Sequence, residues 1–117
     1  MTPIKTLIHE LNEMVLQGKP LDAFEKFYAD DVVMQENNLP PTVGKNANRS
    51  REENFFASLI DFRSAKVLDV AVGENTTMVQ WQYDYTHKDW GVRNYTQVSV
   101  QRWRDNKIVH EQFFYGS

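Results

Sequence analysis

Glu36 is the residue of this 117-residue chain whose type and position are best suited to chemistry. A short apolar run ends in this acid, after two aspartates at positions 30–31 and before two prolines at positions 40–41. We expect a strand over residues 32–36 that points Glu36 into a cavity. An apolar cavity disfavours the charged form of a carboxyl group, so it raises the pKa toward the range useful for proton transfer. The sequence therefore predicts that Glu36 is a general base or acid. The alternative is a solvated carboxylate, or one that caps the loop with the two prolines.

Glu111 is the second candidate acid, in a strand predicted over residues 107–115. If Glu111 and Glu36 share one cavity, their like charges push the two pKa values apart, and one carboxyl holds a proton near neutral pH. The alternative is a cross-strand ion pair between Glu111 and Arg102 or Arg104 on the neighbouring strand.

The residue types that usually bind metals and cofactors give little support for either kind of site. Cysteine is absent, which excludes disulfides, thiolate nucleophiles and cysteine-metal sites. The histidines at positions 9, 87 and 110 are scattered and show no metal-ligand spacing. We therefore expect no metal and no cofactor, and His87 is interpreted as a residue at the mouth of a pocket.

Charge and hydropathy bear on the partners of the chain. The formal net charge is −3, and the Lys and Arg residues are dispersed, so no basic stripe is available for nucleic acid. No apolar run approaches the roughly 18 residues of a membrane span, and the first residues lack the cleavage site of a signal peptide. We expect a cytoplasmic protein that binds neither nucleic acid nor membranes.

Helical spacing occupies the first half of the chain. Apolar residues recur at steps of three and four from position 4 to position 15, which predicts a helix that ends at Gly18. A second helix fits residues 21–28. Ser50 and Glu53 match a capping box, so a third helix is predicted to begin at Ser50 and to reach Ile60.

The second half of the chain alternates with a period of two. Strands are predicted over residues 65–73, 76–87, 93–104 and 107–115, and the short turns between them favour antiparallel hairpins. The length fits one domain, residues 1–117. Three helices on one side of a curved, mainly antiparallel sheet make an α+β fold.

Aromatic side chains are dense on the predicted inner faces of the strands. They are Trp81, Tyr83, Tyr85, Trp103, Phe113 and Tyr115. Such a set is more often core than ligand cage, yet buried Tyr and Trp polar groups need hydrogen-bond partners, which an enclosed ligand would supply. We assign these six residues and Phe55, on the buried stripe of the third helix, as candidate substrate-binding residues. The alternative is core packing.

Three segments carry a resemblance to a known family. Residues 18–31, GKPLDAFEKFYADD, are similar to a helix-break-helix segment that ends in Tyr/Phe-Ala-Asp-Asp; Gly44 precedes a helix; and residues 102–109, RWRDNKIV, form an aromatic-basic hairpin. In this order and spacing they resemble the ketosteroid isomerase and SnoaL-like polyketide cyclase group of the nuclear-transport-factor-2-like superfamily. The resemblance covers nearly the whole chain and implies a cone-shaped sheet that wraps three helices around a pocket.

The resemblance also implies roles for single residues. Glu36 lies where ketosteroid isomerases carry their proton-shuttling Asp, but Ser99 and Leu11 stand where those enzymes carry the two donors of the oxyanion hole. Counting along the strands implies that Glu111 faces the pocket. It also turns Gln97, Ser99 and Gln101 inward, so that Ser99 and Gln101 are candidate substrate-binding residues that hydrogen-bond a carbonyl oxygen.

The outer face of the sheet is then expected to carry Val98, Val100, Ile108 and Phe114, with Met78 nearby. Such an apolar surface predicts a two-fold homodimer packed sheet to sheet.

Two functions follow from these features. The first is a SnoaL-like enzyme in which Glu36 moves a proton next to a carbonyl group of a compact hydrophobic molecule, in an isomerisation, cyclisation or dehydration. The second is a non-catalytic module of the same fold that binds a hydrophobic ligand or forms dimers. An open pocket with Glu36 and a second polar group favours the enzyme, whereas a pocket plugged by Trp81 and Trp103 favours the module.

Overall fold

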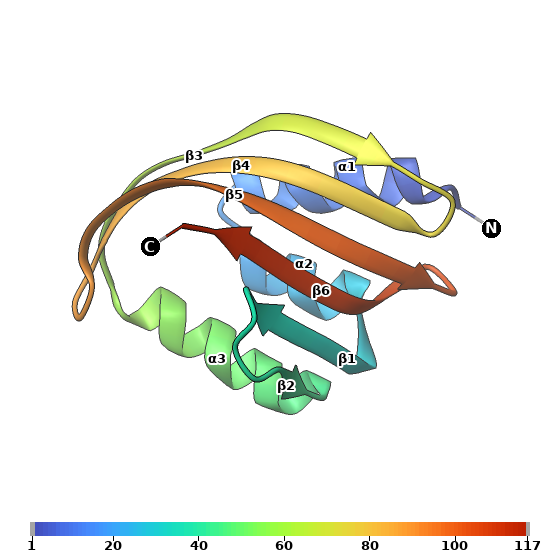
Figure 1. Cartoon of the computed structure of the whole chain (residues 1–117), viewed down its shortest axis with the longest axis horizontal. Helices are drawn as coiled ribbons and strands as arrows, with labels where there is room; N and C mark the ends of the chain where they lie inside the picture. Colours follow the sequence, from blue (N-terminus) through green and yellow to red (C-terminus); the bar gives the residue numbers. More distant parts are fainter. Residues whose placement is uncertain (1, 117) are drawn as a thin grey trace.

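The computed structural model describes residues 2–116 as three helices and six strands (Figure 1). The helices are α1 (Ile4–Leu16), α2 (Pro20–Phe27) and α3 (Lys45–Ala57). The strands are β1 (Tyr28–Glu36), β2 (Thr42–Val43), β3 (Leu59–Val72), β4 (Thr76–His87), β5 (Gly91–Arg104) and β6 (Lys107–Tyr115). The predicted α+β fold is confirmed. No helix of the described residues is long and apolar enough to cross a membrane.

The strands form one curved sheet in the order β2-β1-β6-β5-β4-β3. Only β1 and β6 run parallel; the other neighbours are antiparallel. In Figure 1, α1 and α2 lie behind the sheet, and α3 lies beside β1 at the end that carries β2. The helices therefore cover one face of the sheet, and the other face is open.

The core lies between that sheet face and the apolar sides of α1 and α2. Helix α1 buries Leu7, Ile8 and Leu11, which follow the predicted steps of three and four. From the sheet, Trp81 and Trp103 pack into the same cluster. The core therefore fills the part of the cone around α1 and α2.

Helix α3 begins earlier than the sequence suggested. Its first residue is Lys45, after Gly44 with a φ of 96°, a left-handed conformation that favours glycine. Ser50 is not a cap, because it lies inside the helix and its hydroxyl donates to the Asn46 carbonyl (3.3 Å). The helix ends at Ala57, so Leu59 and Ile60 belong to β3 and not to the helix.

Buried Asn48 fixes the first turn of α3. Its Nδ2 donates to the carbonyls of Gly44 (2.8 Å), Thr42 (3.0 Å) and Val32 (3.3 Å), and the residue is fully buried. These bonds tie the helix to β1 and to the β2 segment. The N-cap residue, Gly44, has no side chain to cap the helix, so Asn48 within the helix anchors this turn instead of the predicted capping box.

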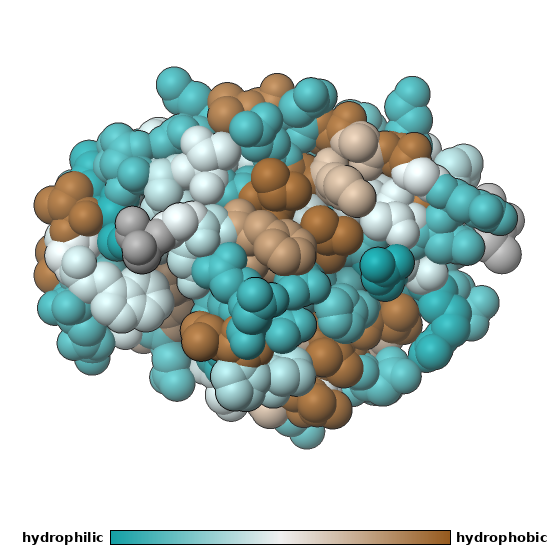
Figure 2. Space-filling view, viewed as in Figure 1, coloured by the Kyte–Doolittle hydropathy of each residue, from teal (hydrophilic) through white to brown (hydrophobic). Residues whose placement is uncertain are grey.

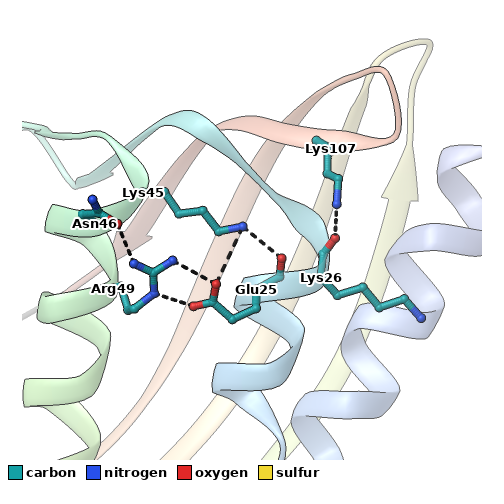
Figure 3. Close-up of polar contacts among 6 residues, drawn as sticks. All are labelled: Glu25, Lys26, Lys45, Asn46, Arg49 and Lys107. Atoms are coloured by element: carbon teal, nitrogen blue, oxygen red, sulfur yellow. Dashed lines mark hydrogen bonds and ion pairs between the residues drawn. The ribbon is translucent and has the colours of Figure 1, made fainter.

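Charged residues join α3 to α2 at the surface (Figure 3). Two guanidinium nitrogens of Arg49 donate to the two oxygens of Glu25, at 2.5 and 2.9 Å, and Lys45 Nζ donates to the Glu25 carbonyl (2.9 Å). The Arg49 hydrogen bond, with the charges of Arg49 and Lys45, holds the pKa of Glu25 below its usual value. An ion pair with two parallel hydrogen bonds restrains both the distance between α3 and α2 and the rotation of α3 about its axis. It therefore helps to determine which side of α3 faces the sheet.

The prediction that Ile108 lies on the outer face of the sheet is wrong. Trp103 pairs with Ile108 whereas Arg102 pairs with His110, so Val109 is an extra residue in β6. This β-bulge reverses the alternation, and Ile108 is fully buried in the core instead of lying on the outer face. Periodicity alone could not show it, because a bulge shifts the phase of the pattern.

Candidate functional site

A cavity of about 580 Å³ opens between α3 and the inner face of the sheet. A volume of this size suits a small organic molecule. About half of its lining residues are aromatic, and the charged residues Glu36, Arg51 and Glu52 also line it. The aromatic lining residues are Phe55, Phe56, Phe62, Tyr83, Tyr85, His87, Trp90, Tyr95 and Phe113.

Aromatic rings in edge-to-face and stacked pairs build the wall nearest the mouth. The ring of Phe55 meets that of Tyr85 edge-on at 5.4 Å, and the Trp90 ring stacks on His87 at 3.8 Å. Trp90 is 57% exposed, so it stands at the entrance, whereas His87 is buried. His87 Nδ1 accepts the backbone N–H of Asp89 (3.1 Å), which fixes the imidazole plane. His87 therefore lines the cavity, but Trp90 and not His87 stands at the mouth where His87 was predicted.

Glu36 lines the cavity, as predicted, but it is not a lone desolvated acid. Its Oε2 lies 2.9 Å from Arg51 Nη2, its Oε1 accepts the Tyr115 hydroxyl (3.2 Å), and 34% of the side chain is exposed. The expectation of a dry acid at this position is wrong, because the first turns of α3 bring an arginine onto it. Burial raises the pKa of Tyr115 to about 12, and the charge and hydrogen bond of Glu36 add to the rise.

Glu52 is a second acid of the cavity wall, and the sequence analysis did not select it. Its side chain is half-buried and lines the cavity. That burial is the main cause of a pKa raised to about 7, with the charges of Glu111 and Glu36 adding to the rise and Arg51 opposing it. A signal was present, because Asn48, Glu52 and Phe55 follow steps of four and three along one helix face.

Glu111 lies behind the wall at 2% exposure. Its Oε1 accepts the hydroxyl of Tyr28, and its Oε2 accepts Gln101 Nε2 (2.8 Å). Burial raises the pKa of Glu111 to about 7, although both hydrogen bonds favour the charged form. It forms no ion pair with Arg102 or Arg104; Arg104 pairs instead with Asp31 (3.1 Å). The charge of Glu111 in turn contributes to the raised pKa of Glu52.

A buried chain of hydrogen bonds continues from Glu111. Thr77 Oγ1 donates to Gln101 Oε1 (2.7 Å) and accepts Trp103 Nε1 (2.9 Å). Every polar atom in this chain has a partner, so the network holds the Glu111 carboxyl in one orientation.

Comparison with known proteins assigns the fold to a family. The SnoaL-like domain family matches residues 8–111. This chain belongs to the SnoaL-like domain family. No match is found among curated proteins.

Solved structures agree with this assignment of the SnoaL-like domain. A Mesorhizobium loti protein, assigned provisionally as a SnoaL-like polyketide cyclase, is 24% identical, with a TM-score of 0.89 over 98% of this chain and 100% of that one. A provisional SnoaL-like polyketide cyclase from Jannaschia sp. CCS1 is 12% identical, with a TM-score of 0.80 over 98% and 89% of the two chains. A provisional polyketide cyclase from Xanthomonas campestris pv. campestris is 18% identical, with a TM-score of 0.75 over 96% and 89%. At these identities the likeness shows the fold.

In this SnoaL-like domain, only some of the predicted substrate-binding residues lie at the cavity. Phe55, Tyr83, Tyr85 and Phe113 line the cavity, and Tyr115 borders it through its bond to Glu36. The other group is buried outside the lining: Trp81, Ser99, Gln101 and Trp103.

The residues of that buried group are already paired. Trp81 stacks on Tyr83 (5.4 Å), and the Ser99 hydroxyl accepts Gln97 Nε2 (3.0 Å). The two tryptophans therefore do not plug the cavity. The amide of Gln101 is occupied by Glu111 and Thr77, and Leu11 lies in the core.

Within residues 2–116, no three His, Asp or Glu side chains gather closely enough to hold a metal ion. The polar residues that line this SnoaL-like site include two carboxyl groups, three tyrosines and one arginine, beside the aromatic rings.

Proposed function

We propose that this SnoaL-like domain is a small-molecule enzyme that moves a proton next to the carbonyl group of a compact hydrophobic compound. One observation carries the proposal: the Glu52 carboxyl lies in the wall of an aromatic cavity with a pKa near 7. A carboxyl with such a pKa is present in both protonation states near neutral pH, which suits a group that takes and returns a proton.

The step begins with Glu52 as the base. The carboxylate takes a proton from the carbon beside the carbonyl group, and the C–H electron pair moves to form an enolate whose negative charge lies on oxygen. The proton then returns to another carbon in an isomerisation. In a cyclisation the enolate carbon attacks a second carbonyl carbon of the same molecule, the π electron pair of that carbonyl moves to its oxygen, and this oxygen takes the proton from Glu52. In a dehydration the enolate expels a hydroxyl group, which leaves as water after protonation.

Arg51 is the group that favours the developing oxyanion. Its guanidinium lines the cavity beside Glu52, and Glu36 holds it through one nitrogen, Nη2. A guanidinium has five N–H donors, so further donors remain for a carbonyl oxygen. In this proposal Glu36, which the sequence favoured as the base, positions Arg51 and keeps its charge in the cavity.

The proposed reaction is tested by exchange of carbon-bound hydrogen for solvent deuterium. The protein is incubated in heavy water with a panel of ketones that have acidic C–H groups, such as tetralone and acetylacetone, and exchange is followed by proton NMR. We expect catalysed exchange that falls at least about a hundredfold in Glu52→Gln. Glu53→Gln, an exposed neighbour on α3, is the matched control and should keep the wild-type rate. Equal rates in Glu52→Gln and the wild type would refute the role of Glu52.

The second candidate function is that of a non-catalytic module that binds a ligand. The observation that favours it is the placement of the Ser99 and Gln101 side chains. Both side chains are hydrogen-bonded within the protein and neither lines the cavity, so neither is available to an oxyanion. A module of this kind predicts binding of hydrophobic ligands without deuterium exchange, and affinity that does not change when Glu52 or Glu36 is replaced by Gln.

We also propose that the domain forms a two-fold homodimer through the outer face of the sheet. Met78 pairs with Val100 and Val98 with Phe114, and these four residues form one apolar patch across three strands. Met78 and Phe114 are 45% and 43% exposed. Figure 2 shows hydrophobic side chains gathered near the centre of this face. Apolar surface of this kind is commonly covered in an assembly.

A further inference from the structure

The acids of the cavity outnumber its positive groups. Glu36, Arg51 and Glu52 line it, and Glu111 lies buried behind the wall. Arg51 is paired with Glu36 at 2.9 Å, and Arg93 lies against the Tyr95 ring, so neither Glu52 nor Glu111 forms an ion pair of its own among the described residues. The cavity therefore presents excess negative charge to whatever binds in it.

The influence of that charge extends to the rings of the wall. Besides burial, the charges of Glu111 and Glu52 raise the pKa of Tyr83, which means that they oppose a further negative charge at its hydroxyl. The same charges would oppose an anionic ligand group and favour a cationic one. Because Glu111 is buried and Glu52 is half-buried, their interactions are screened less than those on the surface.

The wall also offers ring faces suited to a cation. Tyr83, Tyr85 and Tyr95 line the cavity together, with Tyr95 5.9 Å from each of the other two rings. An aromatic face attracts a cation within about 6 Å of its centre. Tyr95 already makes such a contact, since the guanidinium carbon of Arg93 lies 4.9 Å from its ring centre.

From the cavity, its excess acids and its tyrosine faces, we propose that the ligand of this site is an organic cation, a compact aromatic or aliphatic amine whose ammonium group lies between Glu52 and the tyrosine rings. The inference deepens the proposed function and rests on it for one point, that this cavity is where a small molecule binds. The substrate class becomes a carbonyl compound that carries an amine.

An ammonium group would also assist the proposed chemistry. Negative charge from Glu111 opposes an enolate in the cavity, and a positive charge on the substrate offsets it. One oxygen of Glu52 can accept an ammonium N–H while the other takes the proton from carbon. The step still balances, since the ammonium group keeps its protons and only the carbon-bound proton moves.

The alternative is an anionic ligand held by Arg51. The paired state of Arg51 and the two remaining acids count against it, and so the test compares ligands of different charge. Tryptamine, tryptophol and indoleacetate share an indole body and carry an ammonium, a hydroxyl and a carboxylate group. Their binding is measured by isothermal titration calorimetry at about pH 8, above the pKa of about 7 of Glu52 and Glu111.

We expect tryptamine to bind about tenfold more tightly than tryptophol, and indoleacetate to bind least tightly. In Glu52→Gln the preference for tryptamine over tryptophol should disappear while the affinity for tryptophol stays the same. Glu53→Gln should keep the wild-type preference. A melting curve of each variant checks that its fold is intact.

Equal affinity of the wild type for tryptamine and tryptophol, or tightest binding of indoleacetate, would overturn the inference without any variant. A tryptamine preference that persists in Glu52→Gln would overturn it as well. These outcomes are separate from those of the exchange assay. A protein that prefers tryptamine but catalyses no deuterium exchange would refute the enzymatic function and leave the cation site in place.

Discussion

Gln101 Nε2 donates a hydrogen bond to Glu111 Oε2 across the β5–β6 pair at 2.8 Å, with both residues almost fully buried. The amide is itself held by Thr77. This contact orients a carboxyl group whose pKa is raised to about 7, so the protonation of the core acid and the stability of the fold are linked.

The stability of the domain should reflect that linkage. A carboxyl with a pKa of about 7 in the folded state and about 4.5 in the unfolded state binds more protons when folded. Its contribution to the free energy of unfolding is therefore fully present below the unfolded pKa and is lost as the pH rises toward 7. The full shift corresponds to at most about 3 kcal/mol. Urea denaturation of the wild type and Glu111→Gln at about pH 5 and about pH 8 measures it.

Glu111→Gln should reduce this loss of stability between the two pH values. The Tyr28 hydroxyl can rotate to accept the new amide, so the network can stay satisfied while the ionisable group is removed. Equal pH dependence in both proteins would contradict the assignment of the raised pKa to Glu111.

The rate of proton transfer should rise with pH. If Glu52 is the base, only its ionised form is active, so the rate should increase through a pKa near 7 and then level off. The measurement is the initial rate of deuterium exchange across this range. Arg51→Gln removes a charge that lowers the pKa of Glu52, so the midpoint should move to higher pH. A rate that falls as the pH rises would argue against a carboxylate base.

Arg51→Gln should also slow the exchange reaction itself by about a hundredfold, measured on the high-pH plateau. The reason is that the guanidinium beside Glu52 would no longer favour the oxyanion. Arg49→Gln is the matched control, since Arg49 lies on the same helix but pairs with Glu25 outside the cavity. Similar plateau rates for Arg51→Gln and the wild type would remove Arg51 from the mechanism.

Asn48, and not Ser50, should determine the stability of the start of α3. Asn48→Ala removes a fully buried amide that donates to three carbonyls, and it should lower the free energy of unfolding by about 2 kcal/mol. Ser50→Ala should change it by less than about 0.5 kcal/mol, because its hydroxyl makes only an intrahelical bond. Chemical denaturation of both variants measures the difference. A larger loss of stability in Ser50→Ala than in Asn48→Ala would support the predicted capping box instead.

Sedimentation velocity tests the proposed dimer. The wild type should sediment as a dimer at micromolar concentration, and Val98→Asp should sediment as a monomer, because it places a charge in the apolar patch of Met78, Val98, Val100 and Phe114. Val43→Asp is the control, since Val43 is 67% exposed on β2, away from that patch. A wild-type monomer would refute the dimer.

Local patterns in the sequence determined the fold class and the order of its elements. β4 and β6 have the predicted bounds, because alternation with a period of two is a property of neighbouring residues. The same patterns placed Glu36, Phe55 and Tyr85 at a cavity. Contacts between distant residues decided the rest. Arg51 neutralises Glu36 from another element, and the Val109 bulge turns Ile108 inward. Glu52 becomes the chemically suited acid because packing desolvates it near Glu111, and desolvation depends on what surrounds a group in space, which no local pattern encodes.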